Sequence, residues 1–142
     1  MANTATALKP DAMPEVLGIA AYLCVDGATR AAEFYRRAFG AEEVFRHPVD
    51  EQGRTMHVHL HLNRGSLMLS DPYPEYGFPL EAPQAFALHL QVDDVDVWWA
   101  RATAAGAEVA MPLDLMFWGD RYGELRDPFG VKWSLASTPK AS

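Results

Sequence analysis

Apolar and polar residues follow two different periods along the chain, and the changes of period divide it into short elements. Alternation of period two over residues 17–25 and 56–63 is typical of strands with one buried face. Apolar residues at helical spacing over 28–39 and 95–105 predict two helices, each followed by a glycine that ends it. The remaining predicted strands cover 42–47, 67–70, 86–92, 108–111, 120–126 and 131–136.

The order of these elements occurs twice. Residues 25–42 read VDGATRAAEFYRRAFGAE and residues 92–108 read VDDVDVWWARATAAGAE, so both segments open with Val-Asp and close with Gly-Ala-Glu. Internal similarity at a fixed spacing indicates a duplicated structural unit. We therefore predict an α+β fold in which two βαβββ modules form a cupped mixed β-sheet with the helices on its outer face.

The joint between the two halves is marked by composition. Residues 71–83 contain four prolines and one glycine, which predicts a linker loop between modules that cover about 16–71 and 85–137. The two modules would form a single domain over 16–137. Residues 1–15 and 138–142 are predicted to be flexible tails.

Composition and charge narrow the classes of partner. The 142 residues carry 12 basic and 19 acidic side chains, and Arg36-Arg37 is the largest basic cluster, so nucleic acid is not an expected partner. No apolar run approaches a membrane span, and the first residues lack the apolar core of a signal peptide. The single cysteine, Cys24, excludes an intrachain disulfide. We expect a cytoplasmic protein without a membrane partner.

Strand alternation predicts which side chains line the inner face of the cup. Val58, Leu60 and Leu62 would pack on the helix, so the three histidines that alternate with them would point into the cup. The other predicted core positions are Leu17, Ile19, Ala21, Leu23, Phe86, Leu88, Leu90, Val131, Trp133 and Leu135. The predicted cup positions are Tyr22, Cys24, His57, His59, His61, His89, Gln91, Asp120, Tyr122, Glu124, Lys132 and Ser134. Four of the five histidines thus share one predicted surface.

Two interpretations of these histidines stay open. Residues i and i+2 of a strand share a face, so His57 or His59 with His89 or Glu124 could form a metal site. Alternatively, the imidazoles are hydrogen-bonded or solvated, and one of them could act as a general base without metal. Cys24 has no base beside it in the sequence, which favours inert packing.

An apolar and aromatic stretch, MPLDLMFWGDRY over residues 111–122, is predicted to be a long loop that runs into a strand. Met116, Phe117 and Trp118 are consecutive and cannot all face one core, which favours a rim over the cup against simple core filling. Trp118 could stack on a planar ligand. Arg121 could bind an anionic group or, equally, form a structural ion pair.

Three segments carry a family resemblance. AAEFYRRAFGAE, the VDDVD that begins the second helix and WGDRYGELRDPFGVKWSLAS resemble the vicinal oxygen chelate superfamily, which includes glyoxalase I, extradiol dioxygenases and bleomycin-resistance proteins. The ending is most similar to the PhnB-like branch, and the resemblance covers about residues 16–137. It implies the duplicated fold but not an activity, because the superfamily contains lyases, dioxygenases, epimerases, transferases and non-catalytic drug-binding proteins.

The resemblance also implies where a metal would be bound. Enzymes of the superfamily place one ligand, mostly His or Glu, on the first and fourth strand of each half. Counted from the shared motifs, those positions fall at Ala20, Met68, Ala87 and Ser134. None of these is a usual ligand for a hard divalent metal ion, so the standard metal site is expected to be absent.

These observations favour a small-molecule-binding protein with its ligand in the β-cup and no confidently expected cofactor. The alternative is a metal-dependent lyase or isomerase of glyoxalase type with a divalent metal ion at a non-standard histidine site. A homodimer whose cup is vestigial is a third hypothesis, and a homodimer is expected in any case. The catalytic candidates are His57, His89 and Glu124. The ligand-binding candidates are Tyr22, His57, His59, His89, Trp118, Arg121 and Tyr122.

Overall fold

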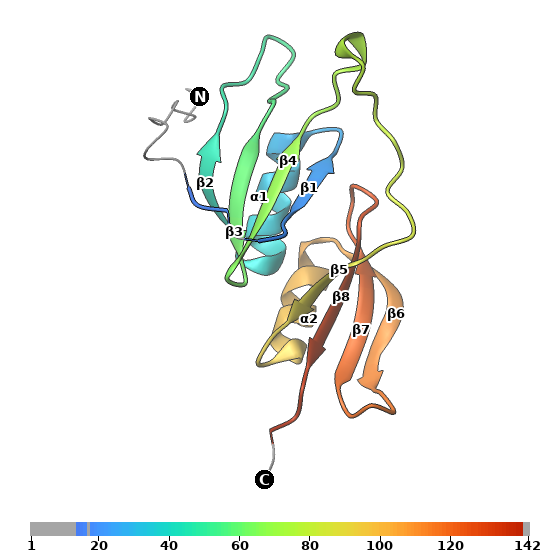
Figure 1. Ribbon diagram of the computed structural model, residues 1–142. Coiled ribbons are helices and arrows are strands. Elements are labelled where there is room, and N and C mark those ends of the chain that lie inside the picture. The colour runs from blue at the N-terminus through green and yellow to red at the C-terminus, as the bar shows by residue number, and fades with distance from the viewer. Residues whose placement is uncertain (1–13, 17, 141–142) are drawn as a thin grey trace. The chain divides into compact units, whose positions relative to one another are not determined.

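A computed structural model describes residues 14–16 and 18–140 (Figure 1). Most of the two predicted tails, residues 1–13 and 141–142, and the predicted core position Leu17 lie outside the described residues. The contacts divide the chain into two compact units, one made mainly of residues up to Glu81 and the other mainly of residues from Ala82 onward. We call them the first and the second module.

The first module is a four-stranded mixed sheet with one helix. Its sheet has the order β1-β4-β3-β2, in which β1 and β4 are parallel and the other neighbours are antiparallel. Figure 1 shows the helix beside the sheet of its own module. The elements are β1 (Ala21–Cys24), α1 (Ala28–Phe39), β2 (Glu42–Arg46), β3 (Val58–Leu62) and β4 (Gly65–Ser70).

The second module repeats this topology with the order β5-β8-β7-β6. Here β5 and β8 are the parallel pair. The predicted α+β fold with two βαβββ modules is thereby confirmed. The elements are β5 (Leu88–Gln91), α2 (Val95–Ala105), β6 (Glu108–Leu115), β7 (Arg121–Arg126) and β8 (Lys132–Ser137).

Both helices have the bounds that the sequence predicts. Gly40 and Gly106 follow them with φ values of 70° and 119°, a left-handed conformation that glycine adopts without a steric penalty. The N–H of each glycine donates to carbonyls of the last helical turn, which satisfies groups that a helix end leaves unpaired. One residue type at one position therefore determines where each helix ends.

Inside the strands most predicted core positions are buried and two, Ala21 and Leu88, are half-buried, whereas the prediction is wrong just before two strands. All predicted core residues of β3 and β8, together with Leu23, Leu90 and Val131, are buried. Ile19 and Phe86 are instead 99% and 46% exposed. The reason is that β1 begins at Ala21 and β5 at Leu88, so both residues precede the hydrogen-bonded strands. Outside a strand, successive side chains need not alternate between two faces.

Two predicted loops contain regular structure. Residues 111–122 are not a loop: β6 continues to Leu115 and a tight turn joins it to β7, with the Met116 N–H donating to the Asp120 carbonyl at 2.8 Å. The linker after β4 contains a short 3-10 helix, η2 (Pro74–Tyr76), and a bridge between Tyr73 and Phe78. This second segment forms one wall of the candidate site.

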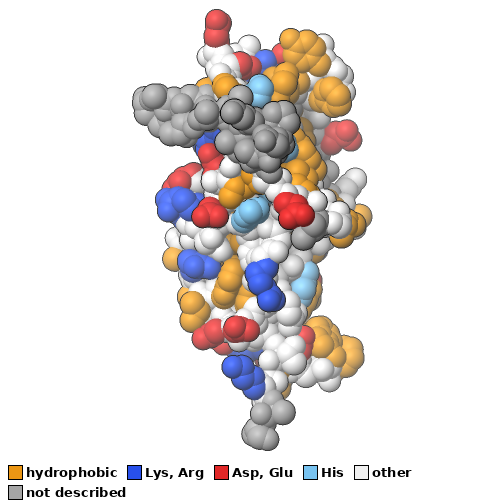
Figure 2. Space-filling view, turned by 60° about the vertical axis from the view of Figure 1, so that its left-hand side comes forward, with side chains coloured by type: hydrophobic (Ala, Val, Ile, Leu, Met, Phe, Trp, Pro, Cys, Tyr) orange, Lys and Arg blue, Asp and Glu red, His pale blue; other side chains and the backbone are white. Residues whose placement is uncertain are grey.

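Among the described residues, the surface that Figure 2 draws has no concentrated basic patch, in agreement with the excess of acidic over basic residues in the sequence. On the face drawn in Figure 2, Lys and Arg side chains lie scattered among acidic and apolar ones. Within the described part of the chain, no helix is long and apolar enough to cross a membrane.

Candidate ligand-binding site

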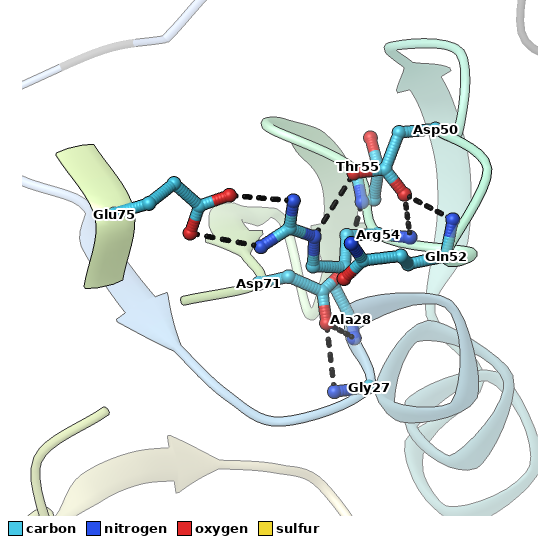
Figure 3. A network of polar contacts seen from close by, with 8 residues as sticks. All are labelled: Gly27, Ala28, Asp50, Gln52, Arg54, Thr55, Asp71 and Glu75. Carbon is cyan, nitrogen blue, oxygen red and sulfur yellow. Dashed lines mark hydrogen bonds and ion pairs between the residues drawn. The ribbon is translucent and has the colours of Figure 1, made fainter. Parts of the chain in front are cut away.

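The first module is organised around one buried carboxylate, Asp71, which directly follows β4 (Figure 3). Its Oδ1 accepts hydrogen bonds from the backbone N–H groups of Gly27 and Ala28 at 2.8 and 3.0 Å. Its Oδ2 accepts from the N–H of Thr55 at 2.8 Å. Gly27 is the N-cap of α1 and has no side chain, so Asp71 caps the helix from a distant part of the chain.

The segment after Asp71 is held by Arg54. The guanidinium donates to both carboxylate oxygens of Glu75, at 3.1 and 2.8 Å, and to Asp50 at 2.9 Å. It also lies 4.4 Å from the ring centroid of Tyr73. The hydrogen bonds from Arg54 lower the pKa of the Glu75 carboxyl, which favours its charged form. Residues 73–75 are therefore fastened to the turn that precedes β3.

A cavity of about 610 Å³ lies between this segment and the edge of the sheet. Its volume falls within the range of about 300–1,000 Å³ that is typical of small-molecule sites. Tyr22 and Cys24, two predicted cup residues, line it from β1. The other lining residues are Met56, Ser70, Asp71, Tyr73, Tyr76, Gly77, Phe78, Pro79 and Glu81.

The register of the first sheet places His59 on the same face as Tyr22. Met68 pairs with both Tyr22 and His59, so these three side chains share the face opposite Leu23 and Leu60. The Tyr22 hydroxyl lies 2.7 Å from His57 Nδ1 and donates to the Met56 carbonyl at 3.2 Å. Burial raises the pKa of Tyr22. The structure thus brings His57 to the cavity through Tyr22.

His59 has a different environment. It is 2% exposed, and its Nε2 lies 2.9 Å from Ser66 Oγ. Burial, followed by the neighbouring His61 and His57, lowers the pKa of His59, and burial and His47 lower that of His57. A buried imidazole with a hydroxyl partner matches the second interpretation, that of a hydrogen-bonded side chain. His59 does not line the cavity.

In the second module a polar and aromatic cluster covers the corresponding face. His89 Nδ1 lies 2.6 Å from Ser134 Oγ, and Nε2 lies 2.8 Å from Gln91 Oε1. The His89 ring stacks on Tyr122, with centroids 6.2 Å apart and an interplanar angle of 18°. The Tyr122 hydroxyl donates to Glu124 at 2.8 Å, and burial, then Glu124, raise the pKa of Tyr122. The structure therefore brings His89, Tyr122 and Glu124 together.

Trp118 and Arg121 differ in their relation to this cluster. Trp118 lies in the β6–β7 turn, is half exposed, and contacts Tyr122 edge-on at 5.5 Å. Arg121 precedes Tyr122 in β7 and so faces the opposite side of the sheet. There it forms a bidentate ion pair with Asp96 of α2, with a shortest contact of 2.7 Å. Of the two interpretations of Arg121, the structure contains the ion pair.

The residues at the family's metal positions do not fit a divalent metal ion. The side chains of Ala20 and Ala87 offer no donor atom and that of Met68 offers only a thioether. The Ser134 hydroxyl is hydrogen-bonded to His89. Among residues 14–16 and 18–140, no group of three or more His, Cys, Asp or Glu side chains is arranged to hold a metal ion. Of the alternative ligand set, His57 and His59 belong to the first module and His89 and Glu124 to the second.

The sequence reasoning missed the wall formed by Tyr73, Tyr76 and Phe78. Proline density identified their segment as a linker and nothing more. The signal that was present is three aromatic residues within six positions of a loop, since a loop has little core of its own in which to bury them.

The comparisons with known proteins agree with the duplicated fold. Residues 16–135 match the model of the Glyoxalase/Bleomycin resistance protein/Dioxygenase superfamily, and the chain belongs to this superfamily. The uncharacterized protein Mb0911c of Mycobacterium bovis is 41% identical over 120 residues, which cover 80% of this chain and 78% of that protein.

Two solved structures show the same fold. Protein PA1353 of Pseudomonas aeruginosa is 30% identical with a TM-score of 0.69, and the match covers 87% of this chain and 99% of that one. A Bacillus cereus structure described as a putative 3-demethylubiquinone-9 3-methyltransferase, PhnB protein, is 25% identical with a TM-score of 0.68. That match covers 86% of this chain and all (100%) of the other.

Proposed function

We propose that the protein binds a small organic molecule in the cavity of its first module and that it does so without a metal ion at the family's usual positions. The observation that carries this proposal is the cavity of about 610 Å³, which combines aromatic walls with a few polar groups. The fixed position of its outer wall supports it further, since the Arg54–Glu75 contact holds that wall before any ligand arrives.

The donor chemistry supports binding over metal-dependent catalysis. Two of the four family positions are alanines, and the imidazoles of His57, His59 and His89 already have hydroxyl partners within 3 Å. Both ring nitrogens of His89 are already hydrogen-bonded, so a lyase or isomerase that used this ring would need it to leave one of its partners. The binding function requires no such rearrangement.

We further propose that the chain belongs to the PhnB-like branch of the superfamily. The support is the ending WGDRYGELRDPFGVKW and the similarity to the Bacillus cereus PhnB protein. In this ending Asp127 has a structural role, because its carboxylate accepts hydrogen bonds from the N–H groups of Phe129 and Val131 and from the Trp133 indole. The motif therefore fixes the turn between β7 and β8 and does not provide chemistry.

We also propose that the protein forms a homodimer. The superfamily commonly pairs its modules across a two-fold axis, and two-fold dimers are the most common soluble oligomers. Light scattering at micromolar concentration should give about twice the chain mass of 15.7 kDa. A mass of one chain across this concentration range would contradict the proposal.

The binding proposal is tested by filling the cavity. Cys24 and Gln91 are the last residues of β1 and β5, and they occupy equivalent positions of the two modules. Cys24→Phe should place a bulky ring among the lining residues, whereas Gln91→Phe serves as the matched control. A fragment library of aromatic compounds of drug size, screened by ligand-observed NMR, should give hits that bind the wild type and Gln91→Phe but not Cys24→Phe.

Two further readouts decide between binding and catalysis. Hits should be recovered unaltered after long incubation, and elemental analysis after dialysis with Zn²⁺, Ni²⁺, Mn²⁺ and Fe²⁺ should find well below one metal ion per chain. Chemical conversion of a bound hit would contradict the binding proposal. So would one tightly held metal ion per chain that is lost in His57→Ala or His89→Ala.

A further inference from the structure

We propose that the cavity of the first module selects an organic cation, namely an amine or quaternary ammonium group carried on an apolar body. This inference rests on the proposed binding function and names the class of ligand. It follows from three properties of the lining residues: the charges around them, the aromatic rings among them, and the volume that they enclose.

The charges around the cavity are predominantly negative. The lining residues include two carboxylates, Asp71 and Glu81, and no Lys, Arg or His. Arg54 lies over the ring of the lining residue Tyr73, and its charge is more than matched by the carboxylates of Asp50 and Glu75. Asp71 accepts its hydrogen bonds from backbone N–H groups at the start of α1 and from Thr55, so no side-chain cation of the described chain pairs with it there and only the helix end offsets part of its charge.

The Cys24 thiol lines the cavity and is influenced by both carboxylates. Burial raises the pKa of Cys24, and the negative charges of Asp71 and Glu81 raise it further. A site that resists the formation of a thiolate resists a bound anion for the same reason. A bound cation is favoured by the same carboxylates.

The aromatic rings provide a second form of cation recognition. Tyr22, Tyr73, Tyr76 and Phe78 line the cavity, and the faces of such rings carry partial negative charge. Tyr73 already holds one cation in this way, since Arg54 lies over its ring. Tyr76 and Phe78 are 66% and 67% exposed, so their rings can be reached by a ligand.

The volume indicates an organic ligand and not an inorganic ion. A cavity of about 610 Å³ holds a molecule of drug size, and the apolar side chains of Met56 and Pro79 would contact its uncharged part. Aromatic walls with acidic groups and no basic side chain are typical of sites that bind alkylammonium groups. The expected ligand is therefore an amphiphilic amine.

Three probes with one aromatic body test the inference. These are (2-naphthylmethyl)trimethylammonium, 2-naphthylmethanol and 2-naphthylacetate, each titrated into the full chain with amide NMR shifts as the readout. We expect shifts at Cys24 and Ser70, an affinity for the cation about tenfold above that for the alcohol, and the weakest binding for the anion.

Two variants and a control assign the selectivity to named residues. Glu81→Gln should reduce the preference for the cation several-fold while the affinity for the alcohol stays the same. Phe78→Leu should lower the affinity for the cation more than the affinity for the alcohol. Glu51→Gln removes an exposed carboxylate of the turn at 50–53, outside the cavity lining, and should change neither affinity.

The failures of the two proposals are distinguishable. Equal affinity for cation and alcohol, with shifts at Cys24 and Ser70, would overturn the cation inference and leave the binding function standing. Tightest binding of the anion would overturn it as well. The absence of shifts at the cavity residues with all three probes would overturn the binding function itself, and the cation inference with it.

Discussion

The two modules share a topology but cap their helices in different ways. In the second module the N-cap residue of α2 is Asp94, whose own carboxylate accepts the N–H of Val97 at 3.4 Å. In the first module the equivalent residue is Gly27, and the carboxylate comes from Asp71, 44 residues further along the chain. The pairing of Val25 with Ser70 and of Val92 with Ala136 makes Ser137 the counterpart of Asp71.

The two caps have different consequences for the segment that follows the last strand of each module. In the second module the cap is local, so helix capping places no constraint on the residue after β8. In the first module the distant cap holds the segment after β4 against the start of α1. That same segment carries Tyr73, Tyr76 and Phe78 into the cavity wall. Helix capping and the candidate site are thus linked in the first module and separate in the second.

Asp71→Ala should destabilise the protein more than any other change considered below. It leaves the N–H groups of Gly27, Ala28 and Thr55 without their acceptor, and we expect a loss of about 2–4 kcal/mol in the free energy of unfolding. Urea denaturation followed by far-UV circular dichroism measures it. All four tryptophans lie in the second module, so tryptophan emission provides a separate record of that half. A loss below about 1 kcal/mol would contradict the distant-cap interpretation.

The second prediction concerns Gly123→Ala, which should destabilise the second module. A Cβ at Gly123 would lie 2.6 Å from Trp99 Cζ3 and 2.9 Å from the Leu113 backbone, so Gly123→Ala should cost about 1–3 kcal/mol. In the first module the equivalent position is Val58, whose side chain is fully buried. Tryptophan emission should report the destabilisation. Trp99→Leu should recover part of the loss in a double-mutant cycle, and additive effects would show that the crowding argument is wrong.

A third prediction concerns the pH dependence of the first module. The pKa values of His57 and His59 are lowered in the folded state, so the unfolded chain binds protons first as the pH falls. The stability that these neutral rings contribute is present above about pH 6.5 and is lost on further acidification. His59→Gln should flatten the decline of the urea midpoint between pH 7 and pH 5. His61→Gln, at an exposed position of the same strand, should leave most of the decline in place.

The smallest effect is expected at the local cap. Asp94→Ala removes one exposed and rather long hydrogen bond, and we expect a loss of about 0.5–1 kcal/mol in the free energy of unfolding. Urea denaturation under the conditions used for Asp71→Ala provides the comparison. An equal or larger loss at Asp94 would remove the distinction between the two modules.

The sequence predicts the parts of this fold that short-range rules govern. Helix ends follow from Gly40 and Gly106, and the histidine face follows from the alternation around Val58 and Leu60. The length of β6 could not be predicted, because Pro112 suggests the end of a strand. It is tolerated there because β6 is an edge strand, whose pairing with β7 is irregular between Met111 and Asp114.

The candidate site could be predicted only in part for a related reason. Tyr22 and Cys24 were found by alternation along one strand. The opposite wall depends on contacts between Arg54 and Glu75 and between Asp71 and Gly27, which join residues 21 and 44 positions apart. Neither contact produces a periodic pattern of residues. The position of the loop beside the cavity therefore cannot be predicted from the local sequence.

The distant cap also governs where the chain can be divided. A fragment of the first half that ends at Ser70 would contain all of its helix and strands and yet lack the acceptor for the first N–H groups of α1. A fragment of the second half that begins before β5 would carry its helix cap within itself. Gene dissection, circular permutation or fusion at this joint should therefore keep Asp71 with the residues that precede it.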